Sequence, residues 1–256
     1  MKVVRRISEL RAELERRRGE SIGLVPTMGA FHAGHISLFE AARAENDVVV
    51  VSLFVNPAQF APHEDFRRYP RDEEHDVRLA EQTGVDLLFA PPAEELYPEG
   101  FQTRVDVEEL GSTLEGRFRP GHFRGVATIC LKLFNIARPA RAYFGQKDAQ
   151  QVEVVRRMVR DLDLEVEIRA LPTVREPDGL AASSRNACLT AEERQRALAL
   201  PRALATRDAD RARALLDGLE VDYLEVAPFD PPVLAAAVRV GSTRLIDNVP
   251  LEGGNQ

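Results

Sequence analysis

Short apolar runs alternate with longer stretches of helical spacing along residues 1–172. The run at 48–55, VVVVSLFV, is apolar almost throughout, which is typical of a strand buried on both faces. Shorter apolar runs predict further strands at 22–25, 86–89, 141–144 and 165–170. Pro26 is expected to end the first of them. Apolar residues at helical spacing predict helices at 8–18, 34–45, 72–83, 126–137 and 148–160.

This alternation predicts an α/β fold in which a mostly parallel, doubly wound sheet is covered by helices. The pattern changes after Pro172, where a turn-rich polar segment begins. Helices are then expected at 191–205 and 208–217, and strands at 221–226, 235–240 and 243–247. We therefore expect two domains, residues 1–172 and a smaller α+β domain at 173–256.

Composition narrows the class of protein. The net charge of −7 argues against a surface that binds nucleic acid, because such surfaces are usually basic. No apolar run approaches the roughly 20 residues that span a membrane, and the charged N-terminus lacks the apolar segment of a signal peptide. Cys130 and Cys188 have no close partner in sequence, which favours a reducing cytoplasm over a disulfide framework.

The first motif with chemical potential is VPTMGAFHAGH, residues 25–35, between a predicted strand and a predicted helix. Gly29 and Gly34 let the backbone turn and approach a ligand, and a helix N-terminus suits phosphate. His32 and His35 could donate hydrogen bonds to phosphate or carry a proton. Structural histidines, a zinc pair and an ordinary turn are the alternatives, but no third zinc ligand is evident. The position at a strand end favours phosphate.

The second motif is FVNPAQF, residues 54–60, directly after the most apolar strand. Asn56 and Gln59 carry neutral amides that suit the hydroxyls and carboxylate of a small polar substrate. A proline-centred turn with solvated amides is the alternative.

The third motif is YFGQKDAQQ, residues 143–151. Lys147 is one of three lysines among 34 basic residues, in a place where a compact charge suits phosphate better than a guanidinium. Asp148 either caps the following helix, which is the default expectation, or accepts from ribose hydroxyls. Gln151 lies one helical turn further on.

The fourth motif is TVREPDGLAASSRNACLT, residues 173–190, at the expected domain junction. Ser183, Ser184 and Arg185 form a polar loop that could close over a triphosphate. A loop that merely enters the helix at 191 is the alternative. Since three motifs fall at strand ends of one sheet and the fourth faces them, the sequence predicts an ATP site in a cleft between domains.

Several long motifs together make the chain resemble the pantoate–β-alanine ligase family. They are PTMGAFHAGH, FVNPAQF, EDFRRYPR, RPGHFRGV, YFGQKDAQQ, GLAASSRN and LIDN, in that family's order. The resemblance implies a Rossmann-like core of nucleotidyltransferase type with a small C-terminal lid domain, and a homodimer. It implies that ATP, pantoate and β-alanine, with Mg²⁺, give pantothenate, AMP and pyrophosphate through a pantoyl-adenylate.

The resemblance also implies roles for individual residues. His35 would be the proton donor, assisted by His32, Lys147 and Arg185. ATP would be bound by Met28, Gly29, Ala30, Phe31, His32, Ala33, Gly34, His35, Gly145, Gln146, Lys147, Asp148, Val174, Ala182, Ser183, Ser184 and Arg185. Gln59 would contact pantoate and β-alanine, and Gln151 would hold pantoate.

Two features depart from the family pattern. The closing loop usually begins with methionine where this chain has Ala182, so apolar packing on the nucleotide is reduced. The C-terminal domain is also short before the strand at 221. Three rival classes remain: a nucleotidyltransferase with a phosphate acceptor, a nucleotide-binding regulator, and a tRNA synthetase, which the acidic charge opposes.

Overall fold

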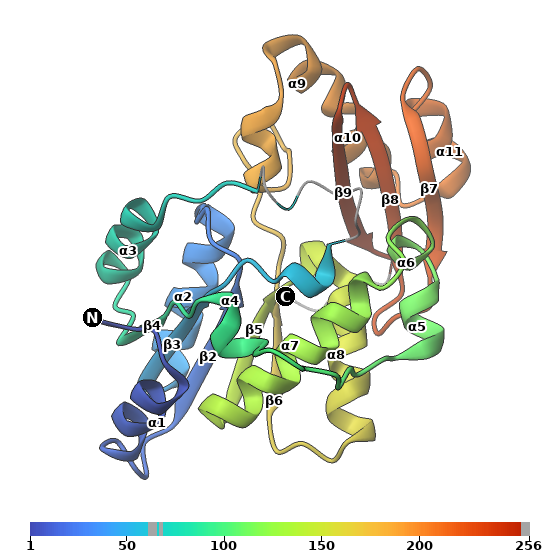
Figure 1. Ribbon diagram of the computed structural model, residues 1–256. Helices are drawn as coiled ribbons and strands as arrows, with labels where there is room; N and C mark the ends of the chain where they lie inside the picture. The colour runs from blue at the N-terminus through green and yellow to red at the C-terminus, as the bar shows by residue number, and fades with distance from the viewer. Residues whose placement is uncertain (61–65, 67–68, 252–256) are drawn as a thin grey trace.

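The computed structural model describes residues 1–60, 66 and 69–251, and it contains two β-sheets (Figure 1). The larger sheet has the strand order β1-β4-β3-β2-β5-β6, and every neighbouring pair is parallel. Its strands are β1 (Lys2–Val4), β2 (Ile22–Thr27), β3 (Val48–Leu53), β4 (Leu87–Phe89), β5 (Arg141–Gly145) and β6 (Glu167–Leu171). The strand order reverses between β2 and β5, which is where doubly wound sheets open a ligand crevice.

Helices cover both faces of this sheet (Figure 1). One face carries α1 (Ile7–Glu15), α7 (His122–Ala137) and α8 (Ala149–Asp161), and the other carries α2 (Ala33–Glu45) and α3 (Glu73–Gln82). Along β3, Val48 and Val50 pack into the first layer, and Val49 and Val51 pack into the second. Because side chains alternate along a strand, β3 needs an apolar residue at every position.

The prediction that Pro26 ends the first strand is wrong. β2 continues to Thr27, and Pro26 pairs in register with Ser52 of β3. The carbonyl of Thr27 accepts from Phe54 on the β3 side, so the adjacent Pro26 faces β5 instead. Pairing with β5 stops at Leu24, and the missing N–H of proline therefore costs no ladder hydrogen bond.

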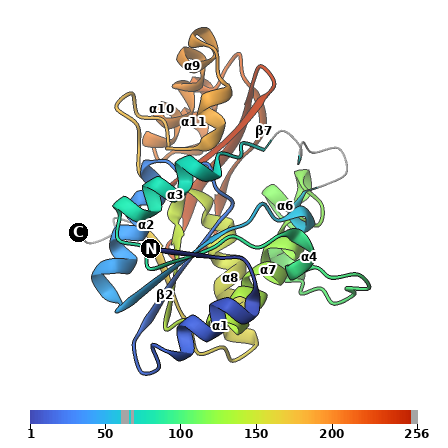
Figure 2. The same cartoon turned by 60° about the vertical axis from the view of Figure 1, so that its left-hand side comes forward.

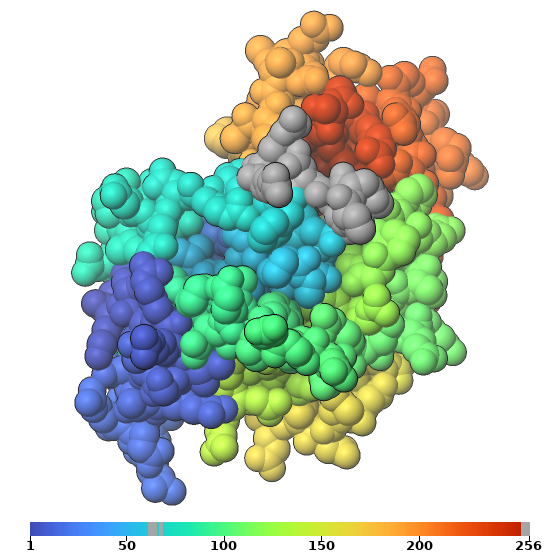
Figure 3. Space-filling model, viewed as in Figure 1, coloured from blue at the N-terminus to red at the C-terminus, as the bar shows by residue number. Residues whose placement is uncertain are grey.

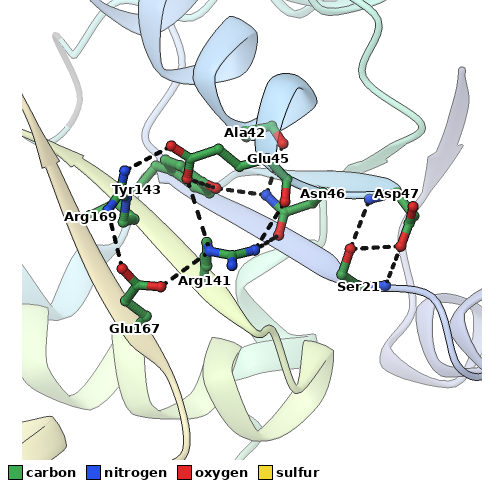
Figure 4. A network of polar contacts seen from close by, with 9 residues as sticks. All are labelled: Ser21, Ala42, Glu45, Asn46, Asp47, Arg141, Tyr143, Glu167 and Arg169. Atoms are coloured by element: carbon green, nitrogen blue, oxygen red, sulfur yellow. Dashed lines mark hydrogen bonds and ion pairs between the residues drawn. The ribbon is translucent and has the colours of Figure 1, made fainter.

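A network of polar side chains closes the amino ends of the strands (Figure 4). Tyr143 donates its hydroxyl hydrogen to Glu45 Oε2 at 2.9 Å and accepts from Asn46 Nδ2 at 2.6 Å. Arg169 donates to the other Glu45 oxygen at 2.8 Å, and Arg141 pairs with Glu167 at 3.1 Å. The hydrogen-bonding groups of these side chains are paired with one another, so the network stabilises this edge of the sheet. Ligand binding is expected at the opposite, carboxyl edge.

The smaller sheet is antiparallel, with β8 (Val233–Val240) between β7 (Glu220–Ala227) and β9 (Thr243–Pro250). Helices α10 (Ala199–Ala205) and α11 (Ala209–Leu215) pack on it through a second apolar core. A parallel sheet with helices followed by a smaller α+β unit confirms the predicted fold class. The domain limit at 172/173 stays a prediction.

The prediction of one helix over 191–205 is wrong in detail. Two helices, α9 (Ala191–Ala197) and α10, meet at Leu198. Pro201 has no N–H to donate to the carbonyl of Ala197, so the helical hydrogen-bond ladder breaks there. Thr190 caps α9 by accepting from Glu193 N at 3.2 Å.

Several short elements lie outside the predicted set. β1 adds an edge strand beside β4, and its three residues are too few to give a periodic signal. The others are α4 (Ala93–Leu96), α5 (Glu108–Ser112), α6 (Glu115–Phe118), η1 (Pro57–Gln59), η3 (Gln146–Asp148) and η4 (Ser184–Cys188). None of the described helices is both long and apolar enough to cross a bilayer.

The C-terminal unit lies at one end of the larger unit (Figures 2 and 3), and β9 contacts η3. Arg244 of β9 makes a two-pronged ion pair with Glu115 of α6, with both N–O distances at 2.7 Å. The side chains are 16% and 7% exposed, so the pair is largely withdrawn from water. Asn248 Nδ2 donates to the carbonyls of Gln146 and Lys147 at 2.9 Å each. The small unit is thereby held against the turn that carries Lys147.

Candidate active site

A cavity of about 220 Å³ opens at the carboxyl ends of β2, β3 and β5. Its walls include Met28 after β2, Gln59 after β3, and Lys147 after β5. Ser184 and Arg185, from the loop before α9, close a further side. The four motifs that are separated in sequence therefore surround one cavity at the switch point of the sheet.

A tight turn between β2 and α2 sets the position of the histidines. Gly29 and Ala30 have positive φ angles of 86° and 53°. The buried Asp76 of α3 accepts from Ala30 N at 2.9 Å and from Phe31 N at 2.7 Å. These two hydrogen bonds offset part of the backbone strain at the turn. The positive φ of Gly29 favours glycine, and a Cβ there would lie 2.7 Å from Leu53 Cδ1 and 2.9 Å from Asp76 Oδ2, so a side chain would displace both groups.

The two imidazoles lie side by side, with ring centroids 4.1 Å apart. His32 Nδ1 accepts from Gly34 N at 3.2 Å, and His35 Nδ1 accepts from His32 N at 3.3 Å. Since both Nδ1 atoms are acceptors, the neutral rings carry their hydrogens on Nε2. His32 and His35 both line the cavity, and each can offer an N–H donor to an anion.

Burial keeps both imidazoles neutral at neutral pH. It lowers the pKa of His32 to about 4, with a further contribution from the Lys147 charge. It lowers the pKa of His35 to about 3, with a further contribution from His32. At neutral pH these groups act as uncharged hydrogen-bond donors.

Lys147 supplies a compact positive charge to the cavity. Its ammonium lies 3.7 Å from Asp148 Oδ1, and its side chain is 16% exposed. Asp148 stands at the N-cap position of α8, as expected, but the expected capping by its side chain is wrong, because it makes no hydrogen bond to the α8 backbone. The carboxylate is therefore free of the capping role and remains in the cavity wall.

The loop at 182–185 presents hydroxyls and a guanidinium. Ser183 caps η4 by accepting from Arg185 N at 3.3 Å. Burial lowers the pKa of Arg185, but a guanidinium stays charged at neutral pH. Ala182 lies near the histidine turn, since a Cβ on Gly34 would sit 3.9 Å from Ala182 Cβ.

The amide motif after β3 is rigidly held. Asn56 Nδ2 donates to Gln59 Oε1 and to the carbonyl of Gly125, both at 3.1 Å. A side chain on Gly125 would collide with the carbonyl of Ala58, so α7 and this loop are in close contact. Gln59 is buried and lines the cavity.

Three further lining residues have no role in the sequence analysis. His122 Nδ1 donates to the Gln59 carbonyl at 2.9 Å, so Nδ1 carries the ring hydrogen and Nε2 is an acceptor. Arg119 Nη1 lies 3.2 Å from this Nε2 and can donate to it. Burial raises the pKa of Tyr69, and a hydrogen bond with Ser184 opposes part of this rise. Their signal was available in two of the motifs that carry the resemblance, RPGHFRGV and EDFRRYPR. In the second motif, positions 64, 65, 67 and 68 lie outside the described residues.

An apolar wall from α7 faces these polar groups. Val126, Ile129, Cys130 and Leu133 line it, which is one face of the helix at the predicted spacing. Burial raises the pKa of the Cys130 thiol to about 12, so the group behaves as an apolar side chain. Both cysteines are free.

Most residues of the predicted site meet in this cavity. They are Met28, His32, Gly34, His35, Gln59, Gly145, Lys147, Asp148, Gln151, Val174, Ala182, Ser183, Ser184 and Arg185. Five others do not line it and instead build its turns, namely Gly29, Ala30, Phe31, Ala33 and Gln146. Whether any of these residues contacts a ligand stays a prediction.

No cluster of three metal-binding side chains occurs among the described residues. The carboxylate of Asp148 is nevertheless a hard oxygen ligand in the cavity wall. Mg²⁺ commonly takes one or two carboxylates together with substrate phosphates, so this donor set fits an ion that arrives on a nucleotide.

The chain matches a known family over almost its full length. The family described as pantoate-beta-alanine ligase matches residues 2–250. A pantothenate synthetase of Moorella thermoacetica is 53% identical, with 93% of each chain covered. Another, of Acetivibrio thermocellus, is 49% identical over 280 aligned positions, with 98% of this chain and 100% of the relative covered. That alignment is longer than the 256 residues of this chain, so the relative carries residues that this chain lacks.

Solved structures of similar chains have the same fold. A pantothenate synthetase of Thermus thermophilus superposes with a TM-score of 0.94 at 48% identity, covering 99% of this chain and 100% of that one. A pantoate-beta-alanine ligase of Francisella tularensis, complexed with beta-gamma ATP and beta-alanine, has a TM-score of 0.89 at 36% identity, with 99% of each chain covered.

Proposed function

The chain belongs to the pantoate–β-alanine ligase family, and on this basis we propose that it forms pantothenate from pantoate and β-alanine in two steps driven by ATP. The pantoate carboxylate first attacks the α-phosphorus of ATP, which gives pantoyl-adenylate and releases pyrophosphate. The amine of β-alanine then attacks the acyl carbon, and AMP leaves. The observation that carries the proposal is the meeting of His35, Lys147, Arg185 and Gln59 around one cavity.

The first step needs alignment and relief of charge rather than a base. A carboxylate is already ionised at neutral pH, since its ordinary pKa is about 4. Lys147, Arg185 and the Nε2–H groups of the two histidines supply positive charge and donors where negative charge grows on the triphosphate. Positioning is the main contribution of a protein to phosphorus transfer.

His35 is the proposed proton donor of this step. A bound triphosphate raises the pKa of the imidazole from the low value that burial gives it, because nearby negative charge favours the imidazolium. In the second step the deprotonated amine is the nucleophile. AMP is a good leaving group, so little acid assistance is required.

In this proposal each substrate occupies the part of the cavity whose side chains match its chemistry. The phosphates lie against the histidine turn, Lys147 and the 182–185 loop, and the adenine lies near Val174. Pantoate lies between Gln59 and Gln151, with its carbon skeleton toward the apolar wall of α7. Gln59 also contacts β-alanine.

Mg²⁺ fits the site as an ion carried by the triphosphate. Asp148 is the carboxylate that would hold it, and when bound it neutralises phosphate charge.

Residues 1–172 bind ATP and pantoate in this proposal, and residues 173–256 act as a lid whose loop at 182–185 closes over the phosphates. We place the protein in the cytoplasm as a homodimer, in keeping with its two free cysteines and with the resemblance to its family. Light scattering after gel filtration tests the dimer, since a monomeric mass at micromolar concentration contradicts it.

The decisive experiment is incubation with ATP, Mg²⁺, pantoate and β-alanine, followed by mass spectrometry. Pantothenate and AMP are the expected products in equal amounts. When β-alanine is withheld, pantoyl-adenylate should accumulate, and labelled pyrophosphate should exchange into ATP only when pantoate is present. Formation of ADP, or pyrophosphate exchange without pantoate, would refute the adenylate route.

A further inference from the structure

We propose that Tyr97 is a positioning residue for the acid substrate: its hydroxyl adds the last hydrogen bond that holds the side chain of Asn56 in place, and Asn56 in turn orients the amide of Gln59 so that its NH₂ group is available to the cavity. This inference rests on the proposed function, since it concerns how Gln59 meets pantoate. Tyr97 lies at the end of α4, outside the cavity wall and far in sequence from both amides.

The orientation of Asn56 is determined by its partners. Its Oδ1 accepts from Ala58 N at 3.2 Å, a group that can only donate. Its Nδ2 donates to the Gly125 carbonyl at 3.1 Å, a group that can only accept. These two backbone contacts exclude the flipped amide.

Tyr97 and Gln59 use the remaining capacity of this amide. The Tyr97 hydroxyl donates to Asn56 Oδ1 at 2.9 Å, and the second hydrogen of Asn56 Nδ2 goes to Gln59 Oε1 at 3.1 Å. Asn56 then makes four hydrogen bonds, which is its full complement of two donors and two acceptors. Although it lines the cavity, Asn56 has nothing left for a substrate and acts through Gln59.

Gln59 is left with a donor for the substrate. Because its Oε1 accepts from Asn56, its Nε2 is the group available to the cavity that Gln59 lines. Two N–H hydrogens suit a carboxylate or hydroxyl oxygen, and an inverted amide would present a lone pair that repels a carboxylate. The chain of hydrogen bonds from Tyr97 through Asn56 to Gln59 therefore favours a substrate that presents an acceptor oxygen, such as the carboxylate of pantoate.

The surroundings of Tyr97 keep its hydroxyl in place. Its ring packs at 5.1 Å from Phe101 and 6.2 Å from Phe54, and the Lys132 ammonium lies 5.9 Å from its centre. Burial raises the pKa of Tyr97 to about 12, so the hydroxyl remains a donor throughout the working pH range.

The test is Tyr97→Phe, which removes the hydroxyl and keeps the ring. Pantoate-dependent pyrophosphate exchange should show the KM for pantoate raised about 3- to 10-fold, the size of one lost hydrogen bond. The KM for ATP should change less than about twofold, because the proposed phosphate contacts come from the histidine turn, Lys147 and the 182–185 loop and not from Asn56 or Gln59. In a Gln59→Ala background, Tyr97→Phe should have no further effect on the pantoate KM, since the two groups act as one unit.

The matched control is Tyr143→Phe, which removes a hydroxyl from the network at the amino edge of the sheet (Figure 4). It should lower stability and leave both KM values unchanged. A wild-type pantoate KM in Tyr97→Phe, equal rises in both KM values, or multiplicative effects in the double variant would overturn the inference. If Gln59→Ala itself keeps the wild-type pantoate KM, the role of Gln59 in the proposed function fails, and the inference fails with it.

Discussion

At the scale of single residues, the site consists of groups whose surroundings select one chemical state. The histidine pair shows this: two backbone N–H groups place both ring hydrogens on Nε2, and burial keeps the rings uncharged. The sequence predicts that His32 and His35 meet a phosphate. It does not reveal the tautomer, because that depends on backbone geometry within the turn.

The role of His35 is tested by His35→Ala. We expect the rate of pantoate-dependent pyrophosphate exchange to fall at least about 100-fold, the scale of one lost proton-transfer or charge-stabilising group. His75→Ala, at an exposed position on α3, is the control and should retain wild-type activity. Near-normal turnover in His35→Ala would end this assignment.

The role of Lys147 is tested by Lys147→Arg. The charge is retained, but a planar guanidinium replaces a compact ammonium in a side chain that is only 16% exposed. We expect kcat/KM for ATP to fall about tenfold or more, which corresponds to about 1.4 kcal/mol. Lys2→Arg, at a largely exposed side chain near the N-terminus that pairs with Glu13, should leave these kinetics unchanged. Wild-type kinetics in Lys147→Arg would show that the shape of the cation is unimportant.

The buried histidines also predict how stability depends on pH. Both pKa values lie below the ordinary 6.5, so the unfolded chain binds protons more readily as the pH falls below 6.5. Folding stability should therefore fall from about pH 6.5 to the folded pKa values of about 4 and about 3. The slope is up to about 1.4 kcal/mol per pH unit for each histidine.

Urea denaturation at pH 7, 6, 5 and 4 measures this dependence. The double variant His32→Asn, His35→Asn should lose less stability than the wild type over that range. Carboxylates contribute equally to both proteins, so the difference between the two curves isolates the histidines. Parallel curves would contradict the shifted pKa values.

At the scale of elements, the sequence does not reveal the contact between α3 and the histidine turn. Asp76 belongs to a helix that was predicted correctly, but its carboxylate serves a loop 45 residues away. It satisfies two N–H groups of a turn with positive φ angles, and this fixes where α2 begins. Long-range partners of this kind leave no mark on local periodicity.

Asp76→Asn tests this contact. One carboxylate oxygen becomes an NH₂ group that faces a backbone N–H, so one hydrogen bond is lost and a donor is left buried. We expect the free energy of unfolding to fall by about 1–3 kcal/mol and the KM for ATP to rise several-fold. Asp72→Ala removes the N-cap of the same helix and should cost about 1 kcal/mol without changing the KM for ATP. Equal KM values in the two variants would show that the turn keeps its shape without Asp76.

At the scale of the whole molecule, the small unit is tied to the large one by the buried pair of Arg244 and Glu115. Arg244→Met leaves the Glu115 carboxylate buried without this partner and also removes the ion pair of Arg244 with Asp222, so we expect a loss of about 3–5 kcal/mol in denaturant unfolding. The exposed pair of Arg117 and Glu225 provides the control, and Arg117→Ala should cost less than about 1 kcal/mol. Adding Glu115→Gln to Arg244→Met should restore part of the loss. Similar losses in the two single variants would show that burial of the pair is unimportant.

The sequence by itself determined the order and type of the long elements, because periods of 2 and 3.6 residues show which faces are buried. It also determined which motifs fall at strand ends, and so the cavity in which His35, Lys147 and Gln59 meet. Only the tertiary structure decided where β2 ends relative to Pro26, the helix break at Leu198 and the absence of a capping hydrogen bond from Asp148. The same holds for the orientation of the Gln59 amide. These features depend on which group lies opposite another in space, and that pairing is set by packing between segments far apart in the chain.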